Sequence, residues 1–214
     1  MRPRPNSNRF QARSARTWRD RLTETRETKE RFLIVCEGTK TEVNYFSSFK
    51  VPGRVLQVKG AGRNTLSLVE YAIGLKTSLE KTMSEGGIFD QCWCVFDRDS
   101  FPSEDFNNAI ARAEAHDFQV AYSNEAFELW YLLHFHYYDT RLSRKAYRSM
   151  LTELFGTKYD KSGDYYAALR PRQPDAIRNS KRLLEKYTDV NSPNDCCPAT
   201  TVHLLVEELN KSVS

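Results

Sequence analysis

The stretch Gln91–Ser100, QCWCVFDRDS, sets a run of large apolar residues directly before two carboxylates, Asp97 and Asp99. Such a run is typical of a strand covered on both faces, which indicates a parallel sheet flanked by helices. Ligands of these sheets bind beyond the carboxyl ends of the strands. Asp97 and Asp99 are two positions apart and would face the same side, so both can reach one hard cation such as Mg2+. A turn that leaves the strand and caps the next helix explains the same residues equally well.

The segments around this stretch alternate between strand and helix patterns. Three more short apolar runs have the length of buried strands: Phe32–Cys36, Val55–Val58 and Phe118–Tyr122. This order predicts an α/β fold with a mostly parallel four-stranded sheet flanked by helices. Helical periodicity continues to the end of the chain. We therefore expect a basic leader at 1–30, an α/β domain at 31–136 and a C-terminal helical extension at 137–214 packed on that domain.

The first strand also ends at a carboxylate, Glu37. Thr39–Glu42 then matches a capping box and predicts a helix that runs to about Phe49. Glu37 can hold a metal ion or move a proton, and the N–H groups of the following turn can face a phosphate. An acidic strand end can also arise by chance, although two in one chain make that less probable.

Four residues are candidates to bind a substrate. Lys40 lies in the turn after Glu37, Arg63 follows two glycines after the Val55–Val58 run, and each offers a cation to a phosphate. Asn124 precedes a helix and Lys161 lies in a loop before Gly163. Tight turns, a helix cap and a surface loop are the simpler interpretations of these positions.

Glu128 lies in a segment that is apolar on every side, Ala126–Phe135. A helix of this composition is buried, and a carboxylate inside it is costly unless it is paired with a cation or bound to a metal. The position of Glu128, one turn after the fourth strand, brings it to the same sheet edge as the other acids. His134 fits a hydrogen-bonded core histidine better than a ligand.

Charge and apolar content restrict the class of protein. Among the 214 residues, positions 1–31 hold ten Lys/Arg and four Asp/Glu, whereas the rest is close to neutral. The leader is expected to be disordered. It could bind along a phosphate backbone, or it could be a solubilising tail without a partner. No apolar run reaches membrane-spanning length, and the beginning lacks a signal-peptide pattern, so we expect a cytoplasmic protein without membrane contact. The five cysteines lack zinc-site spacing.

Four segments in order resemble the RloB-like family: FLIVCEGTKTEVNYF, CVFDRDS, SNEAFELWYLLHF and PATTVHLLVEEL. That family consists of small bacterial proteins regarded as relatives of the Toprim fold. The resemblance implies a Toprim-like sheet in which Glu37, Asp97 and Asp99 gather around Mg2+ or Mn2+, and it matches Glu128 to a further acid of the family. It also implies a role in anti-phage defence beside a separately encoded ATPase. The chain has no Walker A motif of its own.

These observations together predict a Mg2+-dependent nuclease that hydrolyses phosphodiester bonds of RNA, with tRNA favoured, or of DNA. The catalytic set is Glu37, Asp97, Asp99 and Glu128, with Glu37 as general base or ligand of a second ion. A non-catalytic scaffold that binds nucleic acid or the ATPase is the alternative, and phosphoryl transfer of the primase or topoisomerase type is less favoured. Homo-oligomerisation remains open.

Overall fold

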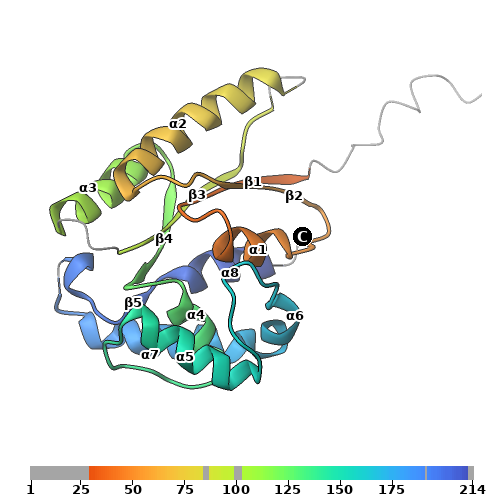
Figure 1. Cartoon of the computed structure of the whole chain (residues 1–214). Coiled ribbons are helices and arrows are strands. Elements are labelled where there is room, and N and C mark those ends of the chain that lie inside the picture. The colour runs from red at the N-terminus through yellow and green to blue at the C-terminus, as the bar shows by residue number, and fades with distance from the viewer. Residues whose placement is uncertain (1–28, 84–86, 99–102, 191, 212–214) are drawn as a thin grey trace, which may run out of the picture.

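The computed structural model describes residues 29–83, 87–98, 103–190 and 192–211. Its centre is a five-stranded sheet in the order β2-β1-β3-β4-β5 (Figure 1). The strands are β1 (Glu30–Cys36), β2 (Arg54–Gly60), β3 (Gln91–Asp97), β4 (Gln119–Asn124) and β5 (Ala199–Thr200). β1 to β4 are parallel, as predicted, and β5 pairs antiparallel with β4. The predicted count of four strands is therefore wrong, because β5 is too short to leave a periodic signal.

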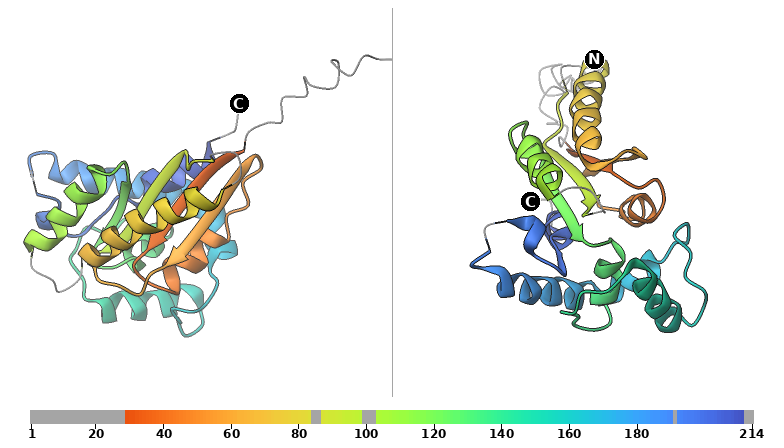
Figure 2. Two further views of the ribbon diagram at one scale, coloured as in Figure 1. Left: turned by 90° about the horizontal axis from the view of Figure 1, so that it is seen from above. Right: turned by 60° about the vertical axis from the view of Figure 1, so that its left-hand side comes forward.

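Helices cover both faces of the sheet (Figure 2). α2 (Thr65–Thr82) and α3 (Ser103–Glu114) pack on one face, while α1 (Thr41–Ser47), α4 (Glu128–Leu133) and the C-terminal helices pack on the other. The C-terminal helices are α5 (Arg144–Phe155), α6 (Tyr166–Leu169), α7 (Gln173–Leu184) and α8 (Val202–Asn210), with 3-10 turns at Arg170–Arg172, Glu185–Tyr187 and Pro193–Asp195. None of the helices in the described ranges is long and apolar enough to cross a bilayer.

Period-2 alternation divides β1 between two cores. Phe32 and Ile34 join the core under α1 and α4, whereas Leu33 and Val35 join the core under α2 and α3. This is why the strand reads as one continuous apolar run in the sequence.

Side-chain caps fix the starts of two helices. The Asn64 side chain accepts a hydrogen bond from the Ser67 N–H at the start of α2 (3.2 Å), and Ser143 accepts one from the Ala146 N–H at the start of α5 (3.2 Å). Gly156 ends α5 with a φ of 66°, a conformation that suits glycine.

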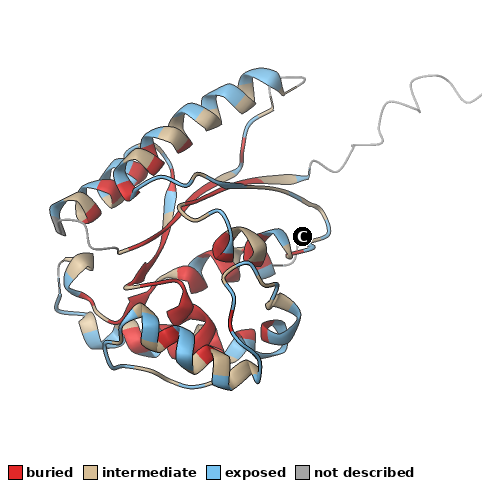
Figure 3. Cartoon of the chain, in the orientation of Figure 1, coloured by how far each residue is buried: buried red, intermediate tan, exposed pale blue. Residues whose placement is uncertain are grey.

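The C-terminal half of the chain completes the core on the face of the sheet that carries α1 and α4. α4 is buried along its whole length (Figure 3), enclosed by side chains of α5, α7 and α8. β5 also adds its two residues to the sheet beside β4. The leader predicted at 1–30 lies outside the described residues except for its last two positions.

Candidate functional site

Glu37 and Asp97 meet where the strand order of the sheet reverses. β1 and β3 are adjacent, and the Glu37 N–H donates to the Val95 carbonyl (2.8 Å). The Asp97 N–H in turn donates to Oε2 of Glu37 (3.0 Å). Two acids sixty positions apart are thus fixed beside each other at the carboxyl end of neighbouring parallel strands, the position at which α/β sheets bind ligands.

The Asp97 side chain belongs to the face of the sheet that carries α1 and α4. It alternates in register with Trp93 and Val95, which lie in the core on that face, and only 8% of the residue is exposed. Burial raises the pKa of Asp97 well above its usual value, and the charges of Glu42, Glu128 and Glu37 raise it further. Burial and the three other carboxylates thus all favour the protonated form of Asp97.

Glu128 is the most deeply buried of these acids. It begins α4, and its side chain is 2% exposed. Its Oε1 has no hydrogen-bond partner; the nearest cations are Lys161 Nζ at 3.7 Å and Arg148 Nε at 3.8 Å. A buried carboxylate oxygen without a hydrogen bond is costly, and such an oxygen is typical of a ligand-binding position.

Glu42 joins this group, although the sequence assigned it to a capping box. The N-cap of α1 is Lys40, no side chain caps the helix, and the helix ends at Ser47, so the predicted box and the predicted end near Phe49 are wrong. Glu42 is buried, and its carboxylate lies against Gly38 so closely that a Cβ at position 38 would collide with it. Burial raises the pKa of Glu42, and the charge of Glu128 adds to that effect.

We call Glu37, Glu42, Asp97 and Glu128 the acidic cluster. Glu42 could have been found by the argument used for Glu128, because each lies at the start of a helix that follows a strand ending at this edge. The capping-box pattern explained Glu42 locally, so Glu42 was not predicted as a site residue.

Three cations face the acidic cluster. Arg144 and Arg148 are one helical turn apart on α5; Arg144 Nη2 lies 3.7 Å from Asp97 Oδ2, and Arg148 approaches Glu128. Lys161 comes from the loop between α5 and α6, which is held on α1 by hydrogen bonds from Thr41 Oγ1 to the Lys161 carbonyl (3.2 Å) and from Asn44 Nδ2 to the Ser162 carbonyl (2.9 Å). The sequence gives no local sign of the two arginines, because cations one turn apart on a helix are equally typical of an exposed surface.

The remaining predicted residues lie as follows. Lys40 is exposed at the start of α1, and the Arg63 guanidinium lies 5.0 Å from the Tyr71 ring centroid on α2. Asn124 is buried, and its Nδ2 donates to the carbonyls of Asn194 (3.0 Å) and Cys196 (2.8 Å). Its amide hydrogens are thus used to hold the segment before β5. Asp99 lies outside the described residues.

The chemistry of the cluster suits a hard divalent cation. Its donors are all carboxylate oxygens, the ligands that Mg2+ prefers, and one of them lacks a hydrogen bond. Within the described residues, no three His, Cys, Asp or Glu side chains stand close enough to form a complete metal site. Asp99, the fourth predicted acid, lies outside these residues.

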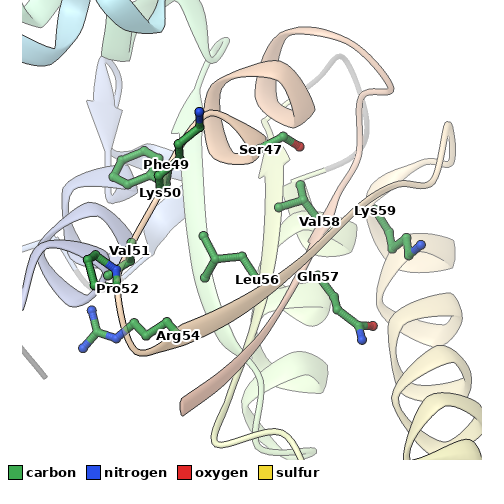
Figure 4. Close-up of a pocket in the computed structure, with 10 residues that line it drawn as sticks. All are labelled: Ser47, Phe49, Lys50, Val51, Pro52, Arg54, Leu56, Gln57, Val58 and Lys59. Atoms are coloured by element: carbon green, nitrogen blue, oxygen red, sulfur yellow. The ribbon is translucent and has the colours of Figure 1, made fainter. Parts of the chain in front are cut away.

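A hollow of about 710 Å³ lies away from the acidic cluster, along the outer strand β2 (Figure 4). Leu56 and Val58 project from β2 into it on the side of α1, and Gln57 points the other way. Its lining holds lysines and one arginine but no acid. The acidic cluster is separate from this hollow, so we assign the site by its chemistry and not by cavity size.

Fold and site together define an α/β protein with a mostly parallel sheet and an acidic cluster at the sheet's carboxyl edge. Residues 32–209 match the family described as RloB-like protein, so this chain belongs to the RloB-like family. No significant match was found among curated proteins or among solved structures.

Proposed function

We propose that this protein is a Mg2+-dependent nuclease with a Toprim-like site at the carboxyl edge of its sheet. The observation that carries the proposal is the contact between Glu37 and Asp97, two strand-end acids that the sequence places sixty residues apart. The deep burial of Glu128 and its unpartnered oxygen add a third acid that water does not stabilise.

Asp97 and Glu128 would hold the cation, with Glu37 and Asp99 as further ligands or, for Glu37, as the base that accepts a proton from water. When bound, Mg2+ supplies positive charge to the phosphate oxygens and makes a bound water more acidic. Arg144, Arg148 and Lys161 can neutralise non-bridging oxygens of the substrate. This adds two arginines to the predicted substrate-binding residues Lys40, Arg63, Asn124 and Lys161.

Membership of the RloB-like family supports a proposal about where and with what partner the protein acts. We propose an effector of anti-phage defence that acts in the cytoplasm with a separately encoded ATPase, and tRNA is the favoured substrate over other RNA or DNA. These proposals rest on what the resemblance to the RloB-like family implies.

The test is incubation of the purified protein with tRNA, single-stranded DNA and duplex DNA, each in Mg2+, Mn2+ or EDTA. We expect cleavage that requires metal and falls at least about a hundredfold in Asp97→Asn and Glu37→Gln, since these substitutions remove ligand charge but keep side-chain size. Asp189→Asn, at an exposed position, is the matched control. Equal binding by all variants with no turnover, also with the ATPase present, would reject the nuclease.

The cations around the acidic cluster favour one second candidate. Arg144, Arg148 and Lys161 already lie within 4 Å of Asp97 or Glu128. A scaffold that grips nucleic acid or the ATPase without cleaving it would use the same cations, and the experiment above separates this role from catalysis.

A further inference from the structure

A second pocket, of about 400 Å³, opens beside the acidic cluster. Its lining comes from three separate segments of the chain: the residue after β3, the end of β4, and the loop that leads into the first turn of α5. The residues are Arg98, Asn124, Glu125, Arg141, Ser143, Arg144 and Lys145. We call it the basic pocket, because four of these seven side chains are cations and one is a carboxylate.

Arg144 joins the basic pocket to the acidic cluster. It lines the pocket, donates to the Glu125 carbonyl (3.3 Å), and places Nη2 3.7 Å from Asp97 Oδ2. A group bound in the pocket therefore lies next to the carboxylates proposed to surround the reacting phosphate.

Two of the other cations, Arg98 and Arg141, are held at the pocket by hydrogen bonds within the protein. Arg98 Nε donates to Asn194 Oδ1 (2.5 Å), and Arg141 donates to Glu125 Oε1 through Nε (3.0 Å) and Nη2 (2.8 Å). The Arg141 side chain is 71% exposed and Lys145 is exposed as well, so both can reach a ligand from solvent. Guanidinium groups held in this way suit the oxygens of a phosphate.

We propose that the basic pocket binds the phosphate of the nucleotide adjacent to the one that is cleaved. The inference rests on the proposed function, since it takes the acidic cluster as the place of the reacting phosphate. A volume of about 400 Å³ exceeds what a phosphate needs and admits a nucleotide of a single strand. The pocket thus sets the position of the strand relative to the carboxylates.

The test measures binding without cleavage. A fluorescein-labelled single-stranded oligonucleotide is titrated in EDTA and followed by anisotropy at several salt concentrations. Arg141→Ala and Lys145→Ala are each expected to weaken binding about fivefold and to reduce the slope of log K against log salt by about 0.7, the value for one phosphate contact on a single strand.

Matched controls separate the pocket from general charge. Arg178 is also an exposed arginine in an ion pair, with Asp175, and Lys81 is an exposed lysine in the last turn of α2. Arg178→Ala and Lys81→Ala are expected to bind like the wild type. Arg141→Lys keeps the charge and is expected to recover part of the affinity.

A charge change of opposite sign gives the sharpest result. Glu125 is the one carboxylate among the lining residues, so Glu125→Gln is expected to tighten binding about threefold. Unchanged or weaker binding in Glu125→Gln, or equal losses in the pocket variants and the controls, would overturn the proposal.

The outcomes also distinguish this inference from the nuclease. Metal-dependent cleavage with no effect of the pocket variants on binding rejects the pocket alone. Weaker binding in Arg141→Ala and Lys145→Ala without cleavage of any substrate rejects the nuclease and keeps the basic pocket as a phosphate site.

Discussion

Asp97 is a buried acid whose pKa is raised by several neighbouring carboxylates. Four influences raise its pKa: burial first, then Glu42, Glu128 and Glu37, while Arg144 acts in the opposite direction. Acids with strongly perturbed pKa values that lie together in one place are typical of functional sites. Like charges repel and burial disfavours ionised carboxylates, so this arrangement destabilises the fold. A bound cation would offset that cost.

Glu42 can be tested through the glycine beside it. In Gly38→Ala the new Cβ would meet only the carboxylate end of Glu42, so the side chain must shift while the backbone need not. We expect cleavage to fall about tenfold to a hundredfold, since a small displacement of a site residue has a large effect on rate. The free energy of unfolding, measured with urea, should change by less than about 1 kcal/mol. Unchanged cleavage would remove Glu42 from the site.

His134 gives a prediction about pH and stability. It is fully buried with Nδ1 2.8 Å from the Trp130 carbonyl, and burial lowers its pKa to about 4 from a usual value of about 6.5. A lowered pKa in the fold means that the unfolded chain binds the proton more readily, so stability is complete above pH 6.5 and is lost as the pH falls towards 4. The loss expected between pH 7 and pH 4 is about 3 kcal/mol from this residue.

The measurement is urea unfolding at several pH values for the wild type and His134→Gln, which keeps a donor for the Trp130 carbonyl. The variant should lose about 3 kcal/mol less than the wild type over this range. His136→Gln, at an exposed position, controls for the loss of an imidazole. Parallel profiles for the wild type and His134→Gln would contradict the assignment of His134 as a neutral core residue.

At the scale of single elements, the strands and long helices could be predicted because their signals are local. β1 and β3 contain continuous apolar runs, and Asn64, Ser143 and Gly156 mark helix ends by their own chemistry. β5 could not be predicted, because two residues carry no period and their pairing with β4 depends on the rest of the fold. Glu42 was misassigned for a related reason: the local pattern fitted, and the tertiary contact with Gly38 overrode it.

Gly74 inside α2 and Gly156 at the end of α5 allow two predictions of opposite sign. Gly74 lies inside α2, and a Cβ added there would stand in open space, so Gly74→Ala should raise the free energy of unfolding by about 0.8 kcal/mol through better helix propensity. Gly156 also has open space, but its φ of 66° opposes any side chain, so Gly156→Ala should lower the free energy of unfolding by about 1 kcal/mol. Urea denaturation measures both. Equal effects of the two substitutions would contradict the assigned end of α5.

For the whole molecule, the order of strands explains why distant acids meet. β1 lies between β2 and β3, so the connections from β1 and β3 leave towards opposite faces of the sheet, to α1 and α3. The carboxyl ends of the two strands are left side by side, and Glu37 and Asp97 occupy them. The sequence predicts this meeting from the strand ends alone, whereas the arrival of Arg144, Arg148 and Lys161 depends on how the C-terminal helices fold back over the sheet.

The central claim is that these carboxylates bind a divalent cation, and this can be tested before any substrate is known. Free Mn2+ is measured by electron paramagnetic resonance as metal-free protein is titrated at neutral pH, for the wild type, Asp97→Asn, Glu128→Gln and the exposed control Asp189→Asn. We predict that the wild type and the control bind Mn2+ alike and that affinity falls at least about tenfold in the other two variants. Equal Mn2+ binding in all four proteins, or none in the wild type, would contradict the claim.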